Sequence, residues 1–92
     1  MSVGDEASIN LVIDSAMKVV DRYILQKPES VIGIEGADGG WTVTVEALIR
    51  KAVPDSQDLL GRYEIRLSSK RNVLGWKLTT VRRRSDCYAQ EI

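Results

Sequence analysis

The chain has 92 residues, 43% of them hydrophobic and 28% charged, which are the proportions of a single ordinary globular domain. It contains no histidine and one cysteine, so a structural zinc site and an internal disulfide are excluded, and the commonest general base is missing. The net charge is zero but unevenly placed. Up to Glu46, three basic and eight acidic residues give −5; from Ala47 onward, ten basic and five acidic residues give +5. This asymmetry either steers a charged partner or, more simply, keeps the surface soluble.

The same sequence features predict where the chain resides. No stretch approaches the ~18 consecutive apolar residues of a membrane span. The first residues lack the basic start and apolar run of a secretory signal. A fold that does not depend on a disulfide suits a reducing compartment. We therefore expect a cytoplasmic protein without membrane contact.

The first predicted element is an amphipathic helix over about residues 5–26. Asp14 and Lys18 form a favourable i,i+4 pair on its polar side. Pro28 disfavours helical backbone at the residue before it, so the helix should end there. Apolar residues recur three and four positions apart, which predicts one buried face: Ile9, Val12, Ile13, Ala16, Val20, Tyr23 and Ile24.

Four β-strands are predicted after the helix, in a sheet over about residues 31–84. The first is a short β-rich run that ends in a glycine-rich turn, which indicates a hairpin. The others alternate between apolar and polar residues, the pattern of strands with one buried face. The expected strands cover about 31–35, 41–49, 60–67 and 73–82, and residues 85–92 are expected to form a loose tail.

These elements predict an α+β fold in which the N-terminal helix packs on a four-stranded antiparallel meander, as a single domain of residues 1–92. The apolar phase of the strands places Trp41, Tyr63 and Trp76 in the core between helix and sheet. The opposite face of the sheet is polar and should contact water or a polar partner.

Residues with catalytic or metal-binding chemistry are few, and each has a simpler structural explanation. Glu46 and Glu64 are expected on one face of neighbouring strands, where basic residues on the same face favour a ladder of ion pairs over acid–base catalysis. Asp55 and Asp58 share a loop without the ligand pattern of a calcium site. Cys87 has no histidine to activate it. We therefore predict no catalytic residue, no metal and no cofactor.

Two other functions stay open on the residues alone. The basic C-terminal half, with Arg82, Arg83 and Arg84, would suit a nucleic-acid or regulatory binding module. The sequence pI of about 6.2 is low for a nucleic-acid binder, and the assignment of the aromatic rings to the core counts against base stacking. A small ligand-binding α+β roll would need a deep pocket between helix and sheet.

The region from Gly40 to Arg84, about half of the chain, resembles the gas vesicle protein O family (GvpO). An ordered set of short motifs carries the resemblance: Gly40-Trp41, Val45-Glu46, Pro54-Asp55, Tyr63-Glu64-Ile65 and Gly75-Trp76-Lys77. The resemblance implies an accessory, non-shell protein that is required for gas vesicle formation. It implies the gas vesicle shell protein and other accessory gas vesicle proteins as partners, and it supplies no catalytic residue.

A protein-binding role requires an exposed surface, and the family-like positions least explained by core packing provide one. They lie in the loop led by proline and on the charged face of the strands. We predict that the following residues bind the partner: Glu46, Pro54, Asp55, Asp58, Arg62, Glu64, Arg66 and Lys77.

Overall fold

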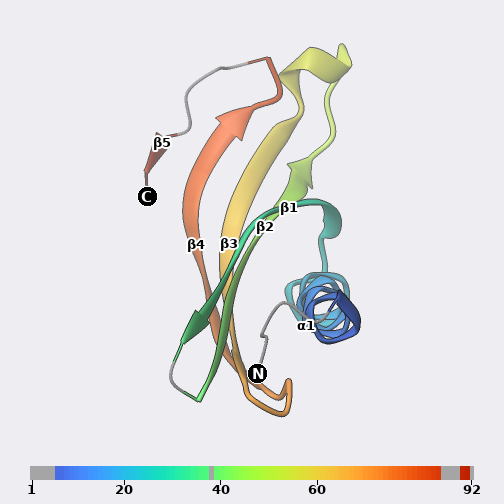
Figure 1. The fold of residues 1–92 in the computed structure, drawn as a ribbon. Helices are drawn as coiled ribbons and strands as arrows, with labels where there is room; N and C mark the ends of the chain where they lie inside the picture. The colour runs from blue at the N-terminus through green and yellow to red at the C-terminus, as the bar shows by residue number, and fades with distance from the viewer. Residues whose placement is uncertain (1–5, 38, 86–89, 92) are drawn as a thin grey trace.

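The computed structural model describes residues 6–37, 39–85 and 90–91, and it has one helical segment followed by an antiparallel sheet (Figure 1). The sheet has five strands in the order β1-β2-β3-β4-β5, so each strand pairs with the next along the chain. The predicted α+β meander is therefore confirmed. The elements are α1 (Glu6–Val19), η1 (Val20–Ile24), β1 (Lys27–Ala37), β2 (Gly40–Arg50), η2 (Asp55–Gln57), β3 (Leu59–Ser68), β4 (Val73–Arg83) and β5 (Gln90–Glu91).

The helical segment ends slightly earlier than predicted. α1 continues into η1, a single π-helical turn, and Leu25 then adopts a left-handed backbone with φ of 62°. The Leu25 N–H donates to the Val20 carbonyl, which satisfies one of the carbonyls at the helix end. Because the helix stops there, Pro28 already belongs to β1, and the sheet begins at Lys27, four residues before the predicted start.

The core lies between α1 and one face of the sheet. α1 packs against β1, β2 and β3. The predicted alternation of β2 and β3 is confirmed, because Val43 pairs with Ile65 and Val45 with Tyr63, and all four side chains are buried. The Tyr63 hydroxyl donates to Gln26 Oε1 at 2.7 Å, so its polar end is satisfied inside the fold. Among the side chains that the structure describes, the helical segment of α1 and η1 contributes four to this core: Val12, Ala16, Val19 and Val20.

Trp76 does not belong to this core, and its predicted place there is wrong. Its side chain is 44% exposed and stacks on Tyr23, with ring centroids 5.9 Å apart and an interplanar angle of 21°. β4 lies beyond the strands that α1 covers, so a side chain on its inner face reaches only the margin of the helix. Trp41 is half-buried against the core, and Tyr63 is fully inside it.

The end of the chain contributes a strand that the sequence analysis missed. β5 pairs with β4 through Thr80 with Glu91 and Val81 with Gln90, where a loose tail was expected. The Ser85 N–H also donates to the Ser56 carbonyl at 3.0 Å. Residues 86–89 and 92 lie outside the described residues.

Candidate protein-binding surface

The sheet face opposite α1, called the open face here, carries most of the predicted partner-binding residues. Across β2 and β3, Glu46 pairs with Arg62 and Thr44 with Glu64, and Lys77 of β4 pairs with Glu64. Two ion pairs form on this face. Arg62 Nε lies 3.3 Å from Glu46 Oε2, and Lys77 Nζ lies 3.8 Å from Glu64 Oε1. The predicted ladder of ion pairs is therefore present at these two rungs.

Glu46 is the buried centre of the ladder. Its carboxylate accepts from Nε and Nη2 of Arg82, both at 2.8 Å, in a two-pronged contact, and its Oε2 also accepts from Arg62 Nε at 3.3 Å. The Arg82 hydrogen bond holds the pKa of the Glu46 carboxyl below its usual value, against the opposing effect of burial. Arg82 was predicted only as part of the basic C-terminal half and not as a partner of Glu46, because its position opposite Leu60 depends on the register shift between β3 and β4.

Asp58 is the second buried carboxylate, and it ties three segments together. Its Oδ1 accepts from the Ala52 N–H at 2.8 Å, and its Oδ2 accepts from Lys51 and Arg84, both at 3.2 Å. The Ala52 hydrogen bond is the main reason that the pKa of Asp58 is lowered. Arg84 reaches on to Glu29 of β1 at 2.8 Å. This network fixes the β2–β3 connection to the end of β4.

The structure therefore divides the predicted partner-binding residues into two groups. Glu46 and Asp58 are only 4% and 0% exposed, so a partner would reach them only if these networks opened. The other six side chains are open or half-open to solvent and form the accessible set: Pro54, Asp55, Arg62, Glu64, Arg66 and Lys77. Pro54 and Asp55 lie in the β2–β3 connection, and the other four lie on the open face.

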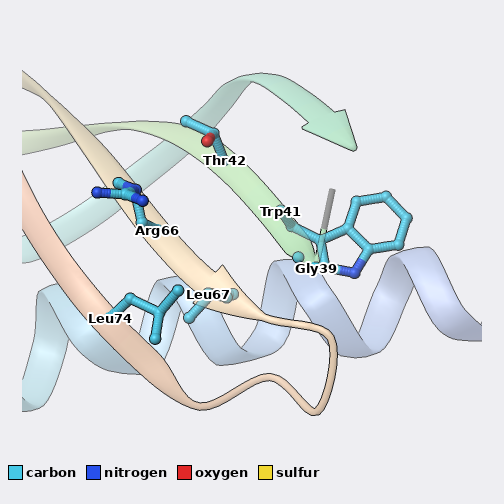
Figure 2. Close-up of a pocket in the computed structure, with 7 residues that line it drawn as sticks. Gly39, Trp41, Thr42, Arg66, Leu67 and Leu74 are labelled. Carbon is cyan, nitrogen blue, oxygen red and sulfur yellow. The ribbon is translucent and has the colours of Figure 1, made fainter. Parts of the chain in front are cut away.

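Two shallow hollows adjoin the accessible set. The smaller, of about 50 Å³, is lined by residues that include Arg66, Leu74 and Trp41, and Figure 2 shows these side chains at the start of β2, near the end of β3 and at the start of β4. The larger, of about 260 Å³, is lined by Glu64, Arg66, Gly75, Trp76 and Lys77. Both volumes lie below the roughly 300–1,000 Å³ of typical small-molecule sites. Their shape suits a side chain of a partner better than an enclosed ligand.

The described residues give no support to metal chemistry or to a helical membrane span. Within them, no group of three or more His, Cys, Asp or Glu side chains converges. Lys51 bridges Asp55 and Asp58 at 2.7 and 3.2 Å, so both carboxylates contact an ammonium group. Among the helices of the described chain, none is long and apolar enough to cross a bilayer. Cys87, predicted to have no chemical role, lies outside the described residues.

Comparison with known families identifies the family of this chain. The model of a family described as gas vesicle synthesis protein GvpO matches residues 2–87. The chain belongs to the GvpO family. The resemblance inferred from the short motifs is thereby confirmed, and the match extends through the N-terminal helix, which carried no specific motif.

Curated relatives within the GvpO family come from archaea and bacteria. The chain is 38% identical to gas vesicle protein O of Haloferax mediterranei over 96 residues, which cover 92% of this chain and 69% of that protein. It is 47% identical to gas vesicle protein O1 of Halobacterium salinarum over 58 residues, 63% of this chain and 49% of that protein. Identity to gas vesicle protein O of a Streptomyces species is 39%, over 53% of this chain and 38% of that protein. No solved structure matches significantly.

Proposed function

We propose that this GvpO-family chain is an accessory, non-shell protein of gas vesicle formation, which acts in the cytoplasm through protein–protein contacts and catalyses no reaction. The family match over residues 2–87 is the observation that carries the proposal. Its partners would be the gas vesicle shell protein and other accessory gas vesicle proteins.

The open face supports a role in protein contact. Its ion pairs combine the buried carboxylate of Glu46 with exposed charges on β3 and β4, where the Lys77 side chain is 72% exposed and the Glu64 side chain 39%. Exposed charges of both signs contribute little to stability, about 0–1 kcal/mol for each surface pair. They are therefore available for electrostatic complementarity with a partner, which raises specificity and the rate of association.

An exchange of charge on the open face tests the proposal. The double variant Glu64→Lys with Arg66→Glu keeps the net charge but reverses the local pattern at two accessible positions. We expect it to capture less shell and accessory protein in pull-downs and to restore fewer floating, vesicle-containing cells to a deletion strain. Circular dichroism would verify that the variant is folded.

The matched control exchanges charge on α1 instead. Asp14→Lys with Lys18→Glu also keeps the net charge, and both side chains are exposed on the helix surface away from the sheet. Capture and vesicle formation should stay at the unmodified level. Equal capture by the open-face variant would disprove the surface assignment, and a deletion strain that still makes vesicles would disprove the accessory role itself.

A further inference from the structure

The edge of β4 is the exposed feature that the proposed function leaves unused. Within the described chain, β5 covers this edge only at Thr80 and Val81. The segment from Val73 to Thr79 therefore presents backbone N–H and C=O groups on its outer side. An uncovered strand edge is a template for an added strand. Because β5 already pairs with β4 along the same edge, the backbone of this edge can pair with a further strand.

An exposed pair of aromatic rings and a shallow hollow lie beside this edge, on opposite faces of the sheet. On the inner side, Trp76 stacks on Tyr23, and the two rings are 44% and 63% exposed. On the open face, Gly75 has no side chain to fill the 260 Å³ hollow, and a Cβ built there meets nothing within 4 Å. A neighbouring strand would place one side chain against Trp76 and the next over Gly75, since adjacent residues point to opposite faces.

The charge of this region selects the partner. Residues 69–84, which comprise β4 and the end of its preceding turn, contain six basic residues and no acidic one: Lys70, Arg71, Lys77, Arg82, Arg83 and Arg84. Arg82 and Arg84 already pair with carboxylates of this chain. The positive charge that a partner meets beside Val73–Thr79 therefore comes from Lys70, Arg71 and Lys77, whose side chain is 72% exposed. A second copy joined edge to edge would bring these like charges together, which is unfavourable. Lysine on an edge strand has the same effect in general, because it blocks self-pairing. An acidic segment, in contrast, would be attracted.

We propose that the edge of β4 from Val73 to Thr79 binds an acidic, extended segment of a partner protein as an additional strand, with apolar side chains of that segment against Trp76 and carboxylates beside Lys77. This inference rests on the proposed function in one respect only, namely that the partner is a gas vesicle protein.

A synthetic peptide tests strand addition on the isolated chain. The probe is a short peptide in which glutamate and valine alternate, added to the isotope-labelled protein. We expect its largest amide shifts, and slower amide exchange, at residues 73–79, with a change in Trp76 fluorescence. A lysine–valine peptide, or the acidic peptide with a central proline, should not produce them.

Two charge reversals locate the contact. Lys77→Glu should weaken binding of the acidic peptide about threefold to tenfold, since a favourable cross-strand charge pair becomes a repulsive one. Lys18→Glu makes the same charge change at an exposed position on α1 and should leave binding unchanged.

Several results would overturn the proposal: peptide shifts on another surface, equal binding of the basic peptide, dimers that form through this edge, or tighter binding of a single-stranded oligonucleotide at physiological salt. None of these readouts requires a second gas vesicle protein. Failure of the peptide test would therefore leave the pull-down result standing, and failure of the pull-down would leave the peptide result standing.

Discussion

At the scale of single residues, the carboxylate of Asp58 links the segment between β2 and β3 to the end of β4 through hydrogen bonds and ion pairs. Asp58→Ala would leave the Ala52 N–H without its acceptor and remove the shared counter-charge of Lys51 and Arg84. We expect a clear fall in the urea midpoint of unfolding, followed by circular dichroism. Asp55→Ala removes a carboxylate that is 77% exposed and should change the midpoint little. Equal shifts for the two variants would contradict this role of Asp58.

Glu46 should make stability depend on pH in the acid range. Arg82 lowers the pKa of this carboxyl in the folded state below its ordinary value of 4.5. Its contribution is therefore complete above pH 4.5 and is lost as the pH falls through the lower folded-state pKa. Glu46→Gln should reduce the free energy of unfolding by about 1.5–3 kcal/mol at pH 7 and by less near pH 3.

Urea titrations at the two pH values measure this difference. Glu35→Gln is the matched control, because Glu35 is exposed on β1 and its removal should cost little at either pH. A cost for Glu46→Gln that is the same at both pH values would show that the ionised carboxylate is not what stabilises the site.

Among the described glycines, Gly40 has the least room for a side chain. A Cβ at this position would collide with the backbone carbonyl of Leu67 on β3, which cannot move without disturbing the β2–β3 pairing. Gly40→Ala should therefore cost about 1–3 kcal/mol of unfolding free energy. At Gly75 the added methyl group has open space, so Gly75→Ala should be tolerated. Chemical denaturation of both variants checks the contrast, and a stable Gly40→Ala protein would contradict it.

At the scale of elements, the two faces of the sheet should respond differently to truncation. Ile65 is fully buried on β3 beneath α1, and Ile65→Ala should cost about 2–5 kcal/mol. Ile32 on β1 is 46% exposed, so the identical substitution there should cost well under half as much. Urea denaturation compares them directly. Similar costs would mean that the core does not lie between α1 and β3.

Strict alternation made β2 and β3 predictable from sequence, with their faces correctly assigned. β1 was predicted too short because Lys27 to Ser30 contain a proline and no alternation; pairing with Ala47 and Leu48 of β2 extends the strand there. β4 alternates as well, but alternation does not reveal that a strand lies at the margin of the helix, where Trp76 stays exposed. β5 spans only two residues and carries no pattern to detect.

At the scale of the whole molecule, the fold brings the two oppositely charged halves of the chain together. Glu29 and Glu46, from the acidic half, pair with Arg84, Arg82 and Arg62 from the basic half. The ladder on the open face was predictable, since it needs only the face assignments of β2 and β3, whereas the pairing of Glu46 with Arg62 also depends on the register of these strands. The partners from the end of β4 were not, because two register shifts between β3 and β4 decide which side chains meet. For the same reason, the burial of Glu46 and Asp58 could not be read from sequence.

The whole chain should unfold as one unit, as the single-domain prediction requires. Neither layer is stable alone: among the described residues, the buried face of α1 packs on the sheet, and the inner face of the sheet includes Val43, Val45 and Ile65, which would otherwise meet water. One shared core implies one cooperative transition. The urea curves from far-ultraviolet circular dichroism and from tryptophan fluorescence should therefore coincide, with a slope of about 1–2 kcal/mol per molar urea. A helical signal lost well before the fluorescence change would instead indicate that α1 docks weakly on a sheet that persists without it.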